Sequence, residues 1–181
     1  TVGTGLVSSL QDNAREIERR LGYPIRIKRI ADLDTNTDRG VEVKSGTLSN
    51  DIEGLLGDPD IDVVVELIGG YEPAKTFILR ALKAGKHVVT ANKALLAQHG
   101  EEIFGKATEM GLEVGFEAAV GGTIPVIRAI KEGFSANRIE KIYGIVNGTA
   151  NYILTKMTEE GLDFETVLTE AQEKGFAEAD P

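Results

Sequence analysis

The stretch Ile61-Asp62-Val63-Val64-Val65-Glu66-Leu67-Ile68-Gly69-Gly70 decides the fold of this chain. Its apolar run is of strand length and nearly continuous, which is typical of a parallel strand that is buried on both faces. Two glycines follow the run directly, at the end of the strand where ligands bind in open α/β sheets. The stretch therefore predicts an α/β fold with a ligand site after this strand.

Helices and strands alternate on both sides of this stretch. Apolar residues recur at helical spacing over residues 6–21, in a helix that Pro73 opens, and between Lys93 and Gly111. A further short helix is expected over residues 51–56. Strand character is found at residues 25–30, 41–43, 87–90 and 112–118. We predict a Rossmann-type doubly wound parallel sheet with right-handed crossovers.

The first residues, Thr1-Val2-Gly3-Thr4-Gly5-Leu6, resemble the end of a glycine-rich dinucleotide-binding turn that is entering its helix. In a Rossmann fold this turn follows the first strand, and the helix N-terminus holds the pyrophosphate. Gly3 would be the last glycine of the turn, so we expect the first strand to precede residue 1 in a longer protein. Asp32 follows the second predicted strand, where a Rossmann domain contacts the adenosine ribose.

The pattern changes near residue 120, where a glycine-rich loop leads into a helix. We predict a dinucleotide-binding domain over residues 1–119, lacking its first strand. The beginning of an α+β substrate-binding and dimerisation domain is expected over residues 120–181. Within it, residues 138–146 have strand character, and helices are expected at residues 147–159 and 164–174.

Composition excludes several classes of function. The chain has 20 Lys and Arg against 29 Asp and Glu, a net charge of −9, whereas nucleic-acid binding needs clustered positive charge. It has no cysteine, which excludes disulfides and cysteine nucleophiles and fits a cytoplasmic protein. No apolar run is long enough to span a membrane. We therefore expect a small-molecule substrate and neither a nucleic-acid nor a membrane partner.

Lys93 is the candidate catalytic residue. It follows Thr90-Ala91-Asn92 at the end of a predicted strand and opens the next helix. A cation is unfavourable at a helix N-terminus, because the helix dipole is positive there. The position therefore favours a lysine that polarises a carbonyl or transfers a proton over a lysine that is merely solvated.

Three other segments each leave two interpretations open. Glu117-Ala118-Ala119-Val120-Gly121-Gly122-Thr123 either binds a hard cation through its carboxylate and accessible carbonyls or is a plain strand-to-helix turn. Asn147-Gly148-Thr149 either contacts a ligand or, as we favour, caps a helix. The carboxylates of Glu178 and Asp180 either face a substrate or belong to a polar tail.

Taken together, six segments resemble homoserine dehydrogenase, in the order in which that family has them and over nearly the whole chain. They are Thr1-Val2-Gly3-Thr4-Gly5; Val64-Val65-Glu66-Leu67-Ile68-Gly69-Gly70; Val89-Thr90-Ala91-Asn92-Lys93; Glu117-Ala118-Ala119-Val120-Gly121-Gly122-Thr123-Ile124-Pro125; Ile145-Val146-Asn147-Gly148-Thr149-Ala150-Asn151-Tyr152-Ile153-Leu154; and Gly175-Phe176-Ala177-Glu178-Ala179-Asp180-Pro181.

The resemblance implies an NAD(P)-dependent oxidoreductase that interconverts L-homoserine and L-aspartate 4-semialdehyde, on the route to threonine, methionine and isoleucine. It implies that Lys93 lines the active site and that Glu178 binds the substrate amino group. It also implies a monovalent cation, usually Na⁺, on the Glu117 side chain and the backbone carbonyls of Val120, Gly122 and Ile124. The residues expected to contact the cofactor are Thr1, Val2, Gly3, Asp32, Gly69, Thr90, Lys93 and Gly175. Family members usually dimerise through the substrate domain, so we expect a homodimer of the full-length parent.

The chain departs from the family pattern at both ends. The family's main catalytic Asp and Lys follow the segment Glu178-Ala179-Asp180-Pro181 and would lie beyond residue 181, so we expect this chain alone to be nearly inactive. For the cofactor, Asp32 favours NAD over NADP, because a carboxylate accepts the ribose 2′-OH and repels a 2′-phosphate. Arg29, Arg39 or Lys44 could still reach such a phosphate.

Three alternatives stay open. One is another Rossmann oxidoreductase, of the aspartate-semialdehyde or saccharopine type, although the first of these uses a cysteine nucleophile and this chain has none. The second is a nucleotide-sensing module without catalysis, which would need neither Lys93 nor Glu178. The third is a bifunctional parent that also carries an aspartate kinase domain.

Overall fold

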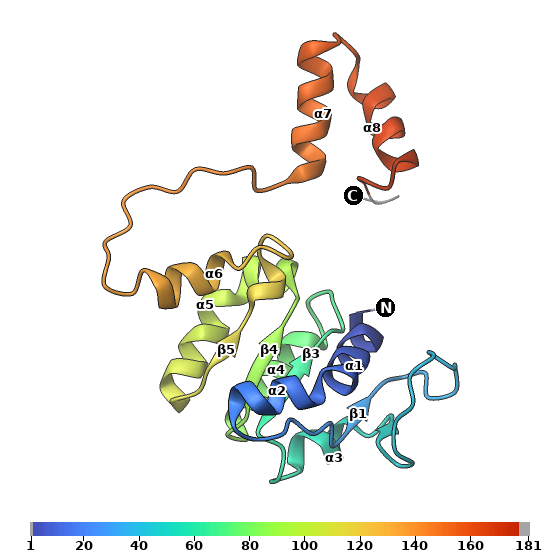
Figure 1. The fold of residues 1–181 in the computed structure, drawn as a ribbon, viewed down its shortest axis with the longest axis vertical. Coiled ribbons are helices and arrows are strands. Elements are labelled where there is room, and N and C mark those ends of the chain that lie inside the picture. Colours follow the sequence, from blue (N-terminus) through green and yellow to red (C-terminus); the bar gives the residue numbers. More distant parts are fainter. Residues whose placement is uncertain (1, 178–181) are drawn as a thin grey trace. The chain divides into compact units, whose positions relative to one another are not determined.

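The computed structural model describes residues 2–177. The chain divides into two compact units, Thr1–Val120 and Gly121–Pro181. The first unit is a parallel α/β structure and the second is helical in its described part (Figure 1).

Parallel strands form the centre of the first unit. One sheet has the strand order β3-β4-β5, and a separate pair joins β1 to β2; all of these pairings are parallel. The strands are β1 (Ile30–Ala31), β2 (Leu48–Ser49), β3 (Val63–Glu66), β4 (His87–Thr90) and β5 (Val114–Gly115). The predicted α/β class with parallel strands is therefore confirmed.

Two long helices cover one face of the three-stranded sheet. α4 (Ala74–Lys83) and α5 (Lys93–Met110), both predicted from helical spacing, pack against each other and against the strands. The core contains Ile78, Leu82, Leu95 and Ile103, none more than 1% exposed, together with Val88 of β4. Both helices end with a glycine in the left-handed region shortly after their last turn, Gly85 and Gly111.

The opposite face of β3 is more open than the sequence predicts. Side chains alternate along a strand, so Val64 points into the core while its neighbours face away from α4 and α5. Val63 is 48% exposed and Val65 is 40% exposed. The prediction that this strand is buried on both faces is therefore wrong for the described residues.

The first predicted helix is interrupted at Asn13. It forms as α1 (Val2–Asp12) and α2 (Ala14–Leu21), and Asn13 between them has φ −103° and ψ 13°. The Ser9 carbonyl accepts from the side-chain amide of Asn13 at 3.0 Å and from its backbone amide at 3.2 Å, so the backbone hydrogen bond is kept at the break. Gly22, with φ 84°, ends α2.

The predicted strand at residues 25–30 pairs only at its end, and the predicted strand at residues 41–43 does not form. Backbone pairing is restricted to Ile30–Ala31 with Leu48–Ser49. Strand formation needs a neighbour at the right distance, and an alternating pattern does not show whether one exists. Between β2 and β3, the short helix expected over residues 51–56 forms as α3 (Ile52–Gly57). Asp51 caps it, because its side chain accepts from the Gly54 amide at 2.8 Å.

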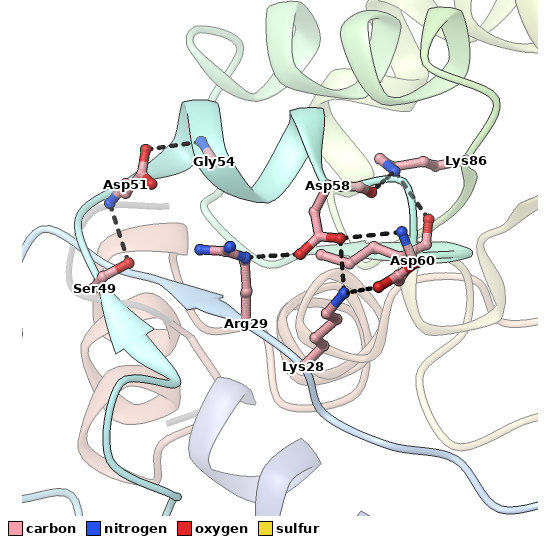
Figure 2. Close-up of polar contacts among 9 residues, drawn as sticks. Lys28, Arg29, Ser49, Asp51, Gly54, Asp58, Asp60 and Lys86 are labelled. Atoms are coloured by element: carbon pink, nitrogen blue, oxygen red, sulfur yellow. Dashed lines mark hydrogen bonds and ion pairs between the residues drawn. The ribbon is translucent and has the colours of Figure 1, made fainter.

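Side chains hold the unpaired segment in place (Figure 2). The Lys28 ammonium lies 2.7 Å from carboxylate oxygens of both Asp58 and Asp60, and Arg29 Nε donates to Asp58 at 3.0 Å. From the other side, the buried Lys86 ammonium donates to the carbonyls of Asp58 and Ile61 at 2.6 and 3.0 Å. These contacts fix residues 28 and 29 to the loop that enters β3.

The second unit contains a helical hairpin. α7 (Gly148–Glu159) and α8 (Phe164–Glu173) bury Ile153, Val167 and Ala171 between them. The glycine-rich loop leads into α6 (Val126–Arg128), which continues as the wider helix η2 (Ala129–Gly133).

The predicted strand at residues 138–146 does not form. Tyr143 is 85% exposed and Val146 is 92% exposed. No strand is described among residues 121–177, so this segment has no partner there with which to pair. Across residues 2–177, no helix is long and apolar enough to cross a membrane.

Candidate functional site

A buried hydrogen-bonded network lies where β3 and β4 end. The Thr90 hydroxyl, fully buried, donates to Glu66 Oε2 at 2.6 Å. Glu66 is 3% exposed, and its other oxygen accepts from the amides of Ile68 and Gly69 at 2.7 and 3.2 Å. The Glu66 carboxylate thus fixes the backbone of the loop after β3 through the amides of Ile68 and Gly69, because charge-assisted hydrogen bonds to a buried carboxylate are strong.

Asn92 connects this loop to the start of α5. Its amide N–H donates to the Thr90 hydroxyl at 3.0 Å, and its side-chain nitrogen donates to the Gly70 carbonyl at 2.7 Å. Its side-chain oxygen caps α5 by accepting from the Leu95 amide at 3.1 Å. One buried side chain therefore connects Gly70 to the helix that carries Lys93.

Neither Glu66 nor Asn92 had an individually predicted role. Both belong to segments that carry the family resemblance, and each is a polar residue at or just after the end of an apolar strand. That position was the available signal, since the carboxyl ends of parallel strands meet at one edge of a sheet. Their contact partners lie 22 to 24 residues away in the chain, which spacing alone does not reveal.

Gly69 and Gly70 expose their backbone at this edge. Both have a positive φ, 81° and 67°, a backbone conformation that residues with a Cβ rarely adopt. Both residues are exposed. The loop therefore offers bare peptide groups in a fixed conformation, a surface that a ligand can approach closely.

Lys93 lies at the same edge, as the first residue of α5. Its side chain is exposed and forms no ion pair or hydrogen bond with any residue in the described range 2–177. The structure therefore brings Lys93 and Gly69 to one edge, through Thr90 and Asn92. A cation held at a helix N-terminus is available to polarise an oxygen of a bound molecule.

The start of α1 lies beside the end of β3. A Cβ placed on Gly3 would come within 4.0 Å of the Leu67 side chain, directly after β3. The first turn of a helix presents unpaired N–H groups and a positive dipole end, which together favour an anion. Val2 and Gly3 are thus placed where the pyrophosphate of a dinucleotide is expected; Thr1 lies outside the described residues.

Asp32 stands at the end of β1 with Asp34 and Arg39. The Arg39 guanidinium lies 3.3 Å from Asp32 and 3.5 Å from Asp34. Hydrogen bonds from the Thr37 side chain, the Thr37 amide and the Asn36 amide hold the pKa of Asp34 at about 2. The Asp32 side chain is 44% exposed, so its carboxylate can still accept hydrogen bonds from ribose hydroxyls. These residues, with the α1 terminus, fit a nicotinamide dinucleotide.

The residues predicted to bind a cation are divided between the two units. Glu117 begins the short helix η1 (Glu117–Ala119), which with Val120 belongs to the first unit, whereas Gly122 and Ile124 belong to the second. Between the last two, Thr123 has a positive φ of 69°. Over residues 2–177 no group of three or more His, Cys, Asp or Glu side chains could hold a metal. The predicted cation site, formed by the Glu117 carboxylate and the backbone carbonyls of Val120, Gly122 and Ile124, stays a prediction.

Gly175 ends α8 in the left-handed conformation, with φ 72°. The next residue, Phe176, accepts a hydrogen bond on its carbonyl from the Thr149 hydroxyl of α7. Asn147 caps α7 by accepting from the Ala150 amide at 2.8 Å, so the favoured capping interpretation is confirmed. The predicted substrate ligand Glu178 lies outside the described residues, and so does Asp180.

Two family models match the chain, one after the other. The model described as "Homoserine dehydrogenase, NAD binding domain" matches residues 1–117. The model described as "Homoserine dehydrogenase" matches residues 125–181. The first match contains the network at the strand ends, Lys93 and Asp32.

Curated relatives and solved structures agree with these matches. The homoserine dehydrogenase of Pseudomonas aeruginosa is 54% identical over 181 residues, and that of Bacillus subtilis is 46% identical. The chain is covered completely in both comparisons but spans only 41% and 42% of these relatives' lengths. A crystal structure of homoserine dehydrogenase from Thiobacillus denitrificans superposes with a TM-score of 0.85 at 50% identity, covering 99% of this chain and 42% of that one.

Proposed function

The chain belongs to the homoserine dehydrogenase family, and from this premise we propose that it forms the cofactor-binding part of an enzyme that interconverts L-homoserine and L-aspartate 4-semialdehyde. The observation that carries the proposal is the succession of two family matches on one chain, over residues 1–117 and 125–181. The strand-end site supports it, because it joins an anion-binding helix start, a ribose-reading carboxylate and a lysine.

Each part of the site has a proposed role. The α1 terminus at Val2 and Gly3 binds the pyrophosphate, and Asp32 binds the adenosine ribose. Gly69 and the Thr90 network position the nicotinamide end, where the bound cofactor supplies hydride chemistry. Lys93 stabilises charge on the reacting oxygen and helps to relay its proton.

The substrate side of the proposal rests on the family resemblance. Glu178 binds the substrate ammonium through a charge-assisted contact, and Gly175 lies near the cofactor. Glu117 holds a monovalent cation, Na⁺, together with the backbone carbonyls of Val120, Gly122 and Ile124. We assign residues 1–119 to cofactor binding and residues 120–181 to the start of a substrate and dimerisation domain.

NAD is the proposed coenzyme in preference to NADP. Asp32 is charged and exposed at the end of β1, where it can accept a ribose hydroxyl. Asp32→Ala should therefore weaken NAD binding more than NADP binding. An unchanged ratio of the two dissociation constants would contradict this assignment.

The decisive experiment assays homoserine oxidation by the chain extended to the length of its relatives. Lys93→Ala should lower kcat roughly a hundredfold while NADH binding is retained. Lys83→Ala, which removes an exposed lysine at the end of α4, is the matched control. Binding of coenzyme without any homoserine-dependent turnover would favour the sensing module over the enzyme. Full activity of Lys93→Ala would refute the role of this lysine.

The extended protein is also proposed to be a cytoplasmic homodimer. The 181-residue chain by itself should have almost no turnover, since the family resemblance implies that the main proton-transferring residues lie beyond residue 181. Homoserine oxidation by the purified chain at a rate comparable to that of the extended protein would overturn this expectation.

A further inference from the structure

Glu66 is a buried carboxylate without a cationic partner, at the edge of the sheet where ligands bind. It is 3% exposed, and over residues 2–177 no Lys, Arg or His side chain forms an ion pair with it. Its hydrogen bonds come instead from the Thr90 hydroxyl and from the amides of Ile68 and Gly69. Three hydrogen-bond donors thus face this carboxyl group, which favours its charged form. The protein therefore holds a negative charge in its interior beside the exposed glycine loop.

The other polar side chains at this edge do not neutralise that charge. Lys93 is exposed, so solvent screens its ammonium group, and Asn92 is neutral. A buried charge without an opposite charge is costly, and the three hydrogen bonds of Glu66 offset only part of the cost. A positively charged group of a ligand bound at this edge would be stabilised by Glu66.

The two oxidation states of the proposed coenzyme differ in such a charge. The nicotinamide ring is a cation in NAD⁺ and neutral in NADH, while the rest of the molecule is the same in both. The proposed function assigns this ring to the edge formed by Gly69 and the Thr90 network. A buried charge is weakly screened, so it acts on the ring without touching it. Glu66 therefore interacts favourably with the oxidised coenzyme and much less with the reduced one.

We infer that Glu66 stabilises bound NAD⁺ relative to bound NADH and thereby favours, on the enzyme, reduction of the semialdehyde over oxidation of homoserine. In that reduction the aldehyde carbon gains a hydride from the reduced ring and the aldehyde oxygen gains a proton, so the ring becomes a cation. The equilibrium in free solution is unchanged, because Glu66 acts on the bound species alone. This inference rests on the proposed function, since it concerns the nicotinamide end of the same site.

Coenzyme binding to the chain extended to the length of its relatives tests the inference. The dissociation constant of NADH is measured by nicotinamide fluorescence, and that of NAD⁺ by displacement of NADH. Glu66→Gln removes the charge and can keep the network, because the new oxygen can accept from the two amides and the new nitrogen can donate to the Thr90 hydroxyl. It should weaken NAD⁺ binding roughly tenfold and NADH binding less than threefold, the order expected for one unit charge at an effective dielectric constant of about 20. Glu109→Gln, at an exposed carboxylate at the other end of α5, is the control and should alter neither constant.

Two further variants separate the charge of Glu66 from its hydrogen bonds. Thr90→Val removes one hydrogen bond and keeps the carboxylate, so it should change both dissociation constants by the same factor. Asn92→Asp adds a negative charge beside Thr90 and still caps α5, because Asp and Asn are similarly good caps. It should strengthen NAD⁺ binding relative to NADH binding by about threefold.

The ratio of the two dissociation constants decides between a charge effect and a structural one. Equal weakening of both coenzymes by Glu66→Gln would show that Glu66 only maintains the loop and would overturn the inference. A ratio that does not move toward NAD⁺ in Asn92→Asp would overturn it as well, whatever the glutamine variant does. In either case coenzyme binding by the unaltered protein leaves the proposed function standing. Unaltered protein that binds neither coenzyme would overturn the proposed function, and this inference with it.

Discussion

Replacing Thr90 with valine should destabilise the first unit through hydrogen bonds alone. Valine has nearly the same shape as threonine, so the fully buried site stays filled and no cavity forms. What disappears is the hydroxyl that donates to Glu66 at 2.6 Å and accepts from the Asn92 amide at 3.0 Å. Both partners are themselves buried, and water cannot easily replace the missing contacts.

The expected loss follows from these two contacts. A hydrogen bond to a charged group contributes about 1.5–3 kcal/mol and one between neutral groups about 0.5–1.5 kcal/mol. Thr90→Val should therefore lower the free energy of unfolding by about 2–4 kcal/mol. Thr90→Ser is the matched control, because it keeps the hydroxyl and removes one buried methyl, at a cost of about 1 kcal/mol.

Urea unfolding followed by circular dichroism measures the difference. With a slope of about 2 kcal/mol per molar urea, the midpoint should fall by about 1–2 M for Thr90→Val and about 0.5 M for Thr90→Ser. Hydrogen exchange at the Ile68 and Gly69 amides, which donate to Glu66, should accelerate in the valine variant. A valine variant that is at least as stable as the serine variant would refute the reasoning, because the network would then contribute nothing.

Three further predictions concern stability. Asp58→Asn should lower the urea midpoint, whereas the control Asp62→Asn, at an exposed carboxylate in the same loop, should not. Lys28, the Asp60 amide and Arg29 hold the pKa of Asp58 below its usual value. The difference in midpoint between Asp58→Asn and the unaltered chain should therefore be complete above about pH 4 and shrink in more acidic solution. Glu170→Gln should destabilise the α7–α8 hairpin, so that helical circular dichroism is lost at a lower temperature, while Glu173→Gln serves as control. Contacts from Lys174, Tyr152 and Lys156 hold the pKa of Glu170 at about 2. The destabilisation should therefore disappear as the pH falls from 4.5 to about 2, and a pH-independent effect would contradict this explanation. Gly111→Ala should lower the free energy of unfolding by about 1–2 kcal/mol, because Gly111 has a positive φ of 67°. Gly105→Ala inside α5, where an added Cβ meets open space, should raise the free energy of unfolding by up to about 1 kcal/mol. Equal effects at the two positions would rule out backbone strain as the cause.

Helices and the turns that end them were predictable because their determinants are local. The buried faces of α4 and α5, the glycine ends at Gly85 and Gly111, and the Asn147 cap all follow from residues within a few positions of one another. The break at Asn13 was missed, because the apolar spacing continues through it.

Strands were less predictable, because a strand exists only where another strand pairs with it. Residues 25–30 and 138–146 both alternate, yet the first pairs only at its end and the second not at all among the described residues. The exposure of Val63 and Val65 was mispredicted for a related reason, because the burial of a strand depends on which distant elements cover each face of its sheet.

The sequence by itself determined the α/β class, the family and the presence of Lys93 at the start of a helix, since these depend on local spacing and on segments in a characteristic order. The tertiary structure alone decided how the candidate site is supported. Thr90 reaches Glu66 across 24 residues, and Asn92 reaches Gly70 across 22. Arg39 lies within 3.5 Å of the carboxylates of Asp32 and Asp34, because the turn after β1 brings the three side chains together. Such contacts depend on where folding places distant residues, and a linear pattern carries no record of that distance.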